Sequence, residues 1–346
     1  MINYRKLLLM LFLIILLFIT YNSFFFEFKN NEKIDDYVLV ASSTATTVSS
    51  WDELKNAVDS GNYDVIKMRN SSSEDWVADS VIVITKNIQI EKDEDTDGNI
   101  LIKRGTTDLL FDIKGGQFIF DGKDEGITID GSYSTNTKQI LYVSDKSNAK
   151  ISQITFKNNS TSINGGAITV NGANLTLENC VISSNKANNG GGIFVTNSDS
   201  ILTVDNTNVL ANNSISGSGG GIYAYGKVSI SNSNISNNTA YSYGGGIMIK
   251  SEAIVKNSKI NSNTATEKNG GGIRSDGKTN ITGGEIKNNK SASGGAGLDF
   301  SSGEAVYNNV VLESNLIGSD EVNVFPDIYS PNNIDWMNDD NLKIKK

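Results

Sequence analysis

The chain contains no histidine, one cysteine and two prolines among its 346 residues. The missing histidine excludes Ser–His and Cys–His nucleophilic sites and histidine-ligated metal centres. The single cysteine, Cys180, excludes a disulfide within the chain. Its position, two residues before a core apolar residue, predicts a buried and inert thiol.

Positive charge is also scarce. The formal net charge is −9 and the isoelectric point is about 4.7. This balance disfavours nucleic acid and anionic surfaces as partners, so we predict no nucleic-acid binding.

Glycine, by contrast, is abundant and periodic. A glycine-rich word ending in an apolar residue recurs six times, at steps of 25, 29, 25, 26 and 25 residues. A fixed period of this length is typical of one small unit stacked on copies of itself. We predict that the closing apolar residues form one interior column: Ile168, Ile193, Ile222, Ile247, Ile273 and Leu298.

A second word runs in phase with the first and consists of an apolar residue followed three positions later by asparagine. The apolar residues are Phe156, Ile182, Leu210, Ile235, Ile260, Ile286 and Leu312. We predict a buried structural ladder at one corner, made by Asn159, Asn185, Asn213, Asn238, Asn263, Asn289 and Asn315. Another apolar column lies five residues before each anchor, except that Val204 precedes Leu210 by six, which indicates a one-residue insertion.

Within each repeat, apolar and polar residues alternate over short segments, as at Leu175 and Leu177. This period of two indicates strands, and Gly, Asn and Ser fill the turns between them. We therefore predict an all-β fold, a right-handed parallel β-helix solenoid. Trp51, Leu54, Ala57 and Val58 share one face of a short helix that starts at Ser50, and this helix is expected to cap the open first coil.

The predicted organisation is a signal anchor or signal peptide at residues 1–27, a linker at 28–49, the β-helix at 50–325 and a C-terminal tail or cap at 326–346. Arg5 and Lys6 precede twenty uncharged residues, 7–26, about the length that spans a bilayer core as a helix. Small residues that would suit cleavage do not follow closely, which favours an uncleaved anchor with the repeats outside the cell. A cleaved secretory signal is the alternative, and either route exports the body.

One acidic loop is similar to the first half of a calcium-binding loop. Asp93, Asp95 and Asp97 occupy positions 1, 3 and 5, and Gly98 occupies position 6. Position 12 is Arg104 instead of glutamate, so a solvated acidic loop is the competing interpretation. Calcium is the one cofactor we consider, and otherwise we expect none.

The β-helix architecture also occurs in polysaccharide lyases and hydrolases, which use clustered carboxylates. The nearest approach to such a cluster is Asp121, Asp124 and Asp130, two of which stand in Asp-Gly pairs typical of turns. We therefore predict no catalytic residues and keep a carbohydrate-active enzyme as the alternative function.

The words Gly165-Gly166-Ala167-Ile168 and Phe156-Lys157-Asn158-Asn159 resemble the repeats of the polymorphic outer-membrane proteins of chlamydiae. The stretch from Trp51-Asp52-Glu53-Leu54 through Ile66 is similar to the start of pectate-lyase-like adhesive domains in surface proteins of bacteria and methanogenic archaea. The resemblance covers residues 50–325 and implies a non-enzymatic, adhesin-like protein of the cell surface. Its expected partners are extracellular glycans or proteins, and the membrane through the N-terminal segment.

Overall fold

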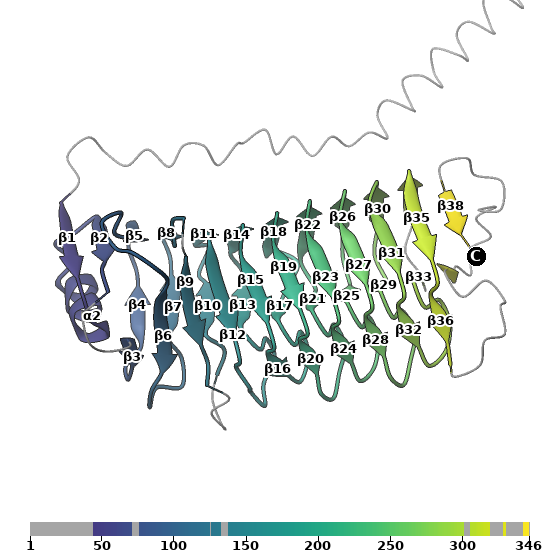
Figure 1. The fold of residues 1–346 in the computed structure, drawn as a ribbon, viewed down its shortest axis with the longest axis horizontal. Coiled ribbons are helices and arrows are strands. Elements are labelled where there is room, and N and C mark those ends of the chain that lie inside the picture. Colours follow the sequence, from purple (N-terminus) through teal and green to yellow (C-terminus); the bar gives the residue numbers. More distant parts are fainter. Residues whose placement is uncertain are drawn as a thin grey trace, which may run out of the picture. The chain divides into compact units, whose positions relative to one another are not determined.

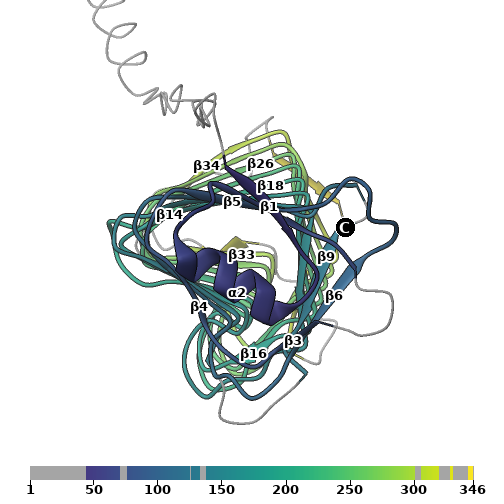
Figure 2. The ribbon, with the colours of Figure 1, turned by 90° about the vertical axis from the view of Figure 1, so that its left-hand side faces the viewer.

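The computed structural model describes residues 44–70, 76–124, 126–132, 138–300 and 305–318, together with the backbone of 328–329 and 342–345. The described body is a parallel β-solenoid in which successive coils contribute strands to the same sheets (Figure 1). The earlier coils contribute to three sheets, and from β16 onward the coils also contribute to a fourth, short-stranded sheet. Seen from the N-terminal end in Figure 2, the chain passes clockwise from sheet to sheet while it recedes from the viewer. The β-helix is therefore right-handed, as predicted.

Neighbouring strands of the first sheet come from successive coils and are parallel. This sheet consists of β1 (Ala45–Val48), β2 (Val65–Met68), β5 (Ile88–Lys92), β8 (Gln117–Asp121), β11 (Asn148–Ser152), β14 (Asn174–Glu178), β18 (Ile201–Asp205), β22 (Lys227–Ser231), β26 (Ala253–Lys256), β30 (Thr279–Thr282) and β34 (Ala305–Asn308).

The second sheet follows the first along each coil. It consists of β3 (Trp76–Ala78), β6 (Ile100–Arg104), β9 (Ile127–Asp130), β12 (Ile154–Lys157), β15 (Val181–Ser183), β19 (Asn208–Leu210), β23 (Asn234–Ser236), β27 (Lys259–Asn261), β31 (Glu285–Lys287), β35 (Val310–Glu313) and β38 (Leu342–Lys345).

The third sheet has two-residue strands and the fourth closes the coil. The third consists of β16 (Lys186–Ala187), β20 (Asn213–Ser214), β24 (Thr239–Ala240), β28 (Thr264–Ala265), β32 (Lys290–Ser291) and β36 (Leu316–Ile317). The fourth consists of β4 (Ile82–Ile84), β7 (Phe111–Lys114), β10 (Leu141–Ser144), β13 (Ile168–Asn171), β17 (Ile193–Val195), β21 (Ile222–Ala224), β25 (Ile247–Ile249), β29 (Ile273–Ser275), β33 (Leu298–Phe300) and β37 (Ile328–Tyr329).

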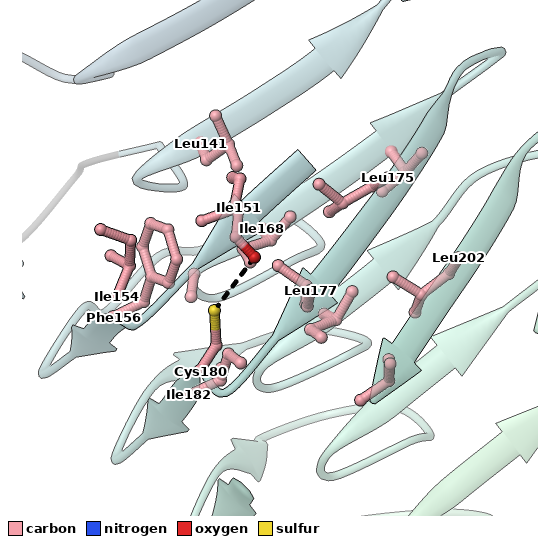
Figure 3. Close-up of a cluster of buried hydrophobic side chains, with 14 of the residues drawn as sticks. Leu141, Ile151, Ile154, Phe156, Ile168, Leu175, Leu177, Cys180, Ile182 and Leu202 are labelled. Carbon is pink, nitrogen blue, oxygen red and sulfur yellow. Dashed lines mark hydrogen bonds between the residues drawn. The ribbon is translucent and has the colours of Figure 1, made fainter. Parts of the chain in front are cut away.

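The predicted interior column is confirmed. Each member of the series from Ile168 to Leu298 is the register partner of the next. All six side chains are fully buried, so isoleucine stacks on isoleucine from coil to coil, with leucine at the last position. Figure 3 shows this packing around Cys180, whose buried thiol lies among Ile151, Phe156 and Leu177 and donates to the carbonyl of Ile151. Burial raises the pKa of this thiol to about 12.

Helix α2 (Trp51–Ser60) covers the N-terminal end of the interior (Figure 2). The Ser50 side chain accepts the backbone N–H of Glu53, and the Glu53 carboxylate accepts the backbone N–H of Ser49 at 2.7 Å. Trp51 is buried, packs edge-on against Phe111 with ring centroids 5.3 Å apart, and donates its indole N–H to Ser80. The helix therefore shields apolar side chains that the open first coil would otherwise expose.

Strands also lie outside the predicted β-helix bounds of 50–325. Strand β1 lies inside the predicted linker, because Ala45–Val48 pairs with β2 and extends the first sheet beyond the helix. Within the predicted tail, β37 pairs with β33 and β38 pairs with β35, so this segment continues two sheets. The predicted anchor at residues 7–26 lies outside the described residues.

The prediction for the coil around Leu210 is wrong by one residue. Val209, which is fully buried, is the register partner of Ile182 and Ile235, whereas Leu210 is half-buried on the other side of the strand. Two adjacent apolar residues are followed by two adjacent asparagines, so both registers satisfy the sequence pattern. With Val209 as the anchor, Val204 stands five residues before it, as in the other coils, and no insertion exists there.

The asparagine ladder moves with that coil, and Asn212 replaces Asn213. Asn185 donates both its backbone N–H and its side-chain amide to Asn212 Oδ1, each at 3.0 Å. Asn212 makes the same two bonds to Asn238. Asn213 instead lies half-buried in β20. The same pattern joins the later members in order: Asn238, Asn263, Asn289 and Asn315.

The three glycines of the repeated word have different roles. In all six words the first glycine has a positive φ, for example 66° at Gly219. The second has no room for a side chain, since a Cβ on Gly220 would meet the carbonyl oxygen of Gly245 at 2.2 Å. The third packs on the ladder, with a Cβ on Gly221 meeting Asn238 Nδ2 at 3.1 Å. Alanine already occupies this third position at Ala167.

Candidate functional site

The outward side of the fourth sheet carries a column of aromatic, apolar and charged side chains. Within each strand the flanking residues point into the interior and the middle residue points out. Stacking of the coils aligns these middle residues into one outer column, in the order Asp112, Tyr142, Thr169, Phe194, Tyr223, Met248, Arg274 and Asp299.

The centre of this column is apolar. Phe194, Tyr223 and Met248 form a hydrophobic cluster separate from the interior core, and Tyr243 packs against it. The Phe194 and Tyr223 rings are 5.3 Å apart, and Tyr225 lies 5.1 Å from Tyr223 and 6.2 Å from Phe194. Tyr225 is 43% exposed, so part of this residue is accessible to solvent beside the buried cluster. Burial, reinforced by Tyr225, raises the pKa of Tyr223.

A charged network borders the aromatic rings. Arg274 donates from Nε to Asp276 Oδ1 at 3.1 Å and from Nη1 to Asp299 Oδ2. Its guanidinium also lies 4.9 Å from the centre of the Tyr243 ring, a cation–π contact. Lys250 donates to Asp276, so two cations and two carboxylates contact one another.

Burial acts on both sides of this network. It raises the pKa of Asp299, and Arg274 opposes that rise. Burial lowers and the two carboxylates raise the pKa of Arg274, with a net increase. Arg274 is therefore held as a cation, which makes it unsuited to act as a base.

Uncharged hydrogen-bonding groups flank the other end of the rings. Asn171 Oδ1 accepts from Thr196 Oγ1 at 2.7 Å and from Asn197 Nδ2 at 3.0 Å. The Asn171 amide donates to the Tyr142 hydroxyl at 2.7 Å. Tyrosine, arginine and short polar side chains on a fixed scaffold are the composition of a binding surface. We call the surface formed by Tyr142, Asn171, Thr196, Asn197, Phe194, Tyr223, Tyr225, Met248, Tyr243, Lys250, Arg274, Asp276 and Asp299 the aromatic face.

The sequence prediction did not include the aromatic face. A signal was available, because the middle residue of a half-buried strand is normally polar, whereas Phe194, Tyr223 and Met248 are apolar. In three consecutive repeats, the expected alternation is broken only at this middle position of the strand.

The Asp residues considered for catalysis form turns. Asp121 Oδ1 accepts the backbone N–H of Lys123 at 3.0 Å, and Asp130 Oδ1 accepts that of Ser132 at 2.8 Å. These bonds are typical of Asx turns. Asp124 is exposed.

The structure does not bring the predicted calcium ligands together. Arg69 binds Asp93 Oδ2 from Nε at 3.0 Å and from Nη2 at 2.6 Å, and it also lies 3.6 Å from Asp95. The Arg69 guanidinium therefore lies where a calcium ion would be expected. Asp97 is exposed. Among the described residues, no three carboxylate or cysteine side chains are grouped closely enough to hold a metal ion.

Arg104, position 12 of that presumed loop, has a structural role that its sequence context does not reveal. It is buried and donates to the backbone carbonyls of Thr107 and Asp108 and to the side-chain oxygen of Asn159. Burial lowers its pKa to about 10, against the opposing influence of Asp108.

In the part of the chain that the structure describes, no helix combines the length and apolar character required to cross a bilayer.

Residues 153–171 match the family model of the Chlamydia polymorphic membrane protein (Chlamydia_PMP) repeat. The matched stretch runs from just before β12 to the end of β13 and contains the words around Asn159 and Ile168. No curated protein and no solved structure matches the chain. The repeat type supports a surface-exposed protein. The chain is thus a right-handed parallel β-helix protein that contains a repeat of the chlamydial polymorphic membrane protein type.

Proposed function

We propose that this protein is an exported, adhesin-like β-helix of the cell surface that binds glycans or other surface partners without chemical conversion. The observation that carries the proposal is the cluster of Phe194, Tyr223 and Met248 on the outside of the solenoid. These three side chains are themselves buried, and Tyr225, which is 43% exposed, packs against Phe194 and Tyr223 and supplies an aromatic side chain that a partner could contact.

The repeat type and the arrangement of charge support the same proposal. The match over residues 153–171 is to a repeat of membrane proteins. On the aromatic face, Arg274 is bound by two carboxylates, so neither carboxylate stands ready as a free acid or base. A rigid stack of coils with satisfied backbone groups suits display of a binding surface.

Attachment is part of the proposal. We propose that residues 7–26 remain on the mature protein as a single membrane anchor, with Arg5 and Lys6 inside the cell. N-terminal sequencing of the cell-associated protein tests this step. A mature chain that begins anywhere between residues 20 and 45 would refute the anchor and leave export intact.

Surface display and the absence of catalysis are tested on the full chain expressed in cells. Protease treatment of intact cells is expected to remove an epitope tag placed at the C-terminus, whereas an intracellular control protein survives. The purified protein, incubated with a panel of neutral and acidic polysaccharides, is expected to release no reducing ends and no unsaturated uronates. Protection of the tag would contradict surface display, and cleavage of any polysaccharide would favour the enzyme alternative.

A further inference from the structure

We propose that the aromatic face binds an uncharged glycan chain that lies along the solenoid axis and places a sugar ring on Tyr225. This inference rests on the proposed function and deepens it, because it assigns the surface and the chemical class of the partner.

Tyr225 is suited to stack on a sugar ring. A sugar ring has an apolar C–H face and an edge of hydroxyl groups, so it requires an aromatic plane with hydrogen-bonding groups at the side. Tyr225 is 43% exposed, and its ring packs nearly perpendicular to Phe194 and tilted against Tyr223. Asn197 and Thr196 supply amide and hydroxyl groups from the preceding coil. Because neighbouring rings hold Tyr225, little side-chain entropy is lost on binding.

The charges of the aromatic face favour a neutral ligand. Lys250 and Arg274 are both bound to Asp276, and Arg274 is also bound to the buried Asp299. An anionic or cationic chain would have to displace one of these partners and would leave a charge unpaired. A chain without charge leaves all of these pairs in place.

The spacing of the coils favours a glycan over a peptide. Successive coils present equivalent side chains at roughly 4.8 Å, the distance between hydrogen-bonded strands. Side chains on one face of an extended peptide recur at roughly 6.8 Å, so a peptide along the axis would fall out of phase within a few coils. A sugar residue in an extended chain is similar in length to one coil step.

The test is the binding of the full-length protein, in mild detergent, to soluble polysaccharides of defined charge. The probes are hydroxyethylcellulose and mannan, which are neutral, polygalacturonate, which is anionic, and glycol chitosan, which is cationic. Affinity gel electrophoresis measures the dissociation constants. We expect retardation by at least one neutral polymer and weaker retardation by both charged polymers.

Variants locate the site. Tyr225→Ala is expected to weaken binding about tenfold, as for an aromatic hot spot, whereas Tyr225→Phe retains binding because the ring remains. Tyr241→Ala is the matched control: Tyr241 is a tyrosine 51% exposed that lies outside the aromatic face. Unchanged circular dichroism and melting of all three variants establish that they are folded.

Three results would overturn the inference: no binding to either neutral polymer, preferential binding to a charged polymer, or equal effects of Tyr225→Ala and Tyr241→Ala. None of them would remove the proposed surface function, which is measured separately by protease accessibility and by the absence of polysaccharide cleavage. Loss of surface display, conversely, would contradict the proposed function even if purified protein bound the neutral polymers.

Discussion

Arg104 Nη2 donates a hydrogen bond of 3.1 Å to Asn159 Oδ1, which is the first member of the asparagine ladder. Every later asparagine in the ladder has its side-chain oxygen occupied by the asparagine of the preceding coil. The coil before Asn159 has Gly131 near that position and cannot do this. Arg104 reaches from one coil further back and satisfies the acceptor, so the ladder begins without an unpaired group.

Replacing Arg104 should therefore destabilise the N-terminal half of the solenoid. Arg104→Met leaves Asn159 Oδ1 and the carbonyls of Thr107 and Asp108 without this donor, and we expect a loss of about 1–3 kcal/mol. Arg104→Lys retains the charge but lacks the planar fork, so a smaller loss is expected. Thermal melting of the full-length protein in mild detergent measures both. If Arg104→Met melted at the same temperature as the wild type, the arginine would not terminate the ladder.

The register of the coil around Val209 can be tested with two adjacent asparagines. Asn212→Ala removes the acceptor for two N–H groups of Asn185, and we expect destabilisation by about 1–3 kcal/mol. Asn213→Ala changes a half-buried residue outside the ladder and should alter stability by less than about 0.5 kcal/mol. Denaturant unfolding of the two variants, compared with wild type, gives these values. The opposite order of effects would restore the register with Leu210 as anchor.

Alanine substitutions at two neighbouring glycines should also destabilise the protein to different extents. Gly220→Ala places a Cβ 2.2 Å from the Gly245 oxygen and 2.4 Å from the Thr239 oxygen, so backbone must move. We expect a cost of about 1–3 kcal/mol or more for this overpacking. Gly221→Ala should cost less, because its Cβ would meet the Gly246 oxygen at 2.8 Å instead of 2.2 Å and alanine occurs at the equivalent position, Ala167. The melting temperatures of the two variants test this difference. Equal losses of stability would argue against the close approach of backbone at Gly220.

Cys180 should make stability fall at high pH. The folded-state pKa is raised by burial from 9.0 to about 12, so between these values the unfolded chain has lost the thiol proton and the folded chain retains it. The free energy of unfolding should thus decrease by about 1.4 kcal/mol per pH unit from this group as pH rises above 9, and be unaffected by it below.

Cys180→Ser is the control for that measurement, since Ser233 and Ser258 occupy the corresponding corner in later coils. The difference between wild type and variant across pH 8–11 isolates the thiol from tyrosines and lysines that titrate in the same range. Native Cys180 is also expected to resist alkylation at pH 8 until the protein is denatured. Rapid alkylation of the folded protein, or parallel pH profiles, would contradict the burial of the thiol.

Local spacing in the sequence determined most of the architecture. The period near 25, the interior column from Ile168 to Leu298 and the capped helix that begins after Ser50 depend on residues close in the chain. Because each coil repeats the same local pattern, an error in predicting one coil does not shift the prediction for the next, and the stack is predictable.

The tertiary structure decided what local spacing leaves ambiguous. Val209 with Asn212 and Leu210 with Asn213 fit the same pattern, and only stacking on Ile182 and Asn185 selects the first pair. Arg104, the last residue of β6, meets Asn159 across 55 positions, and nothing in its local sequence indicates this contact. The aromatic face arises because side chains from separate coils are brought together by the parallel register. Alternation within one strand specifies which side a residue faces, whereas its neighbours on that side are set by the stacking of distant residues.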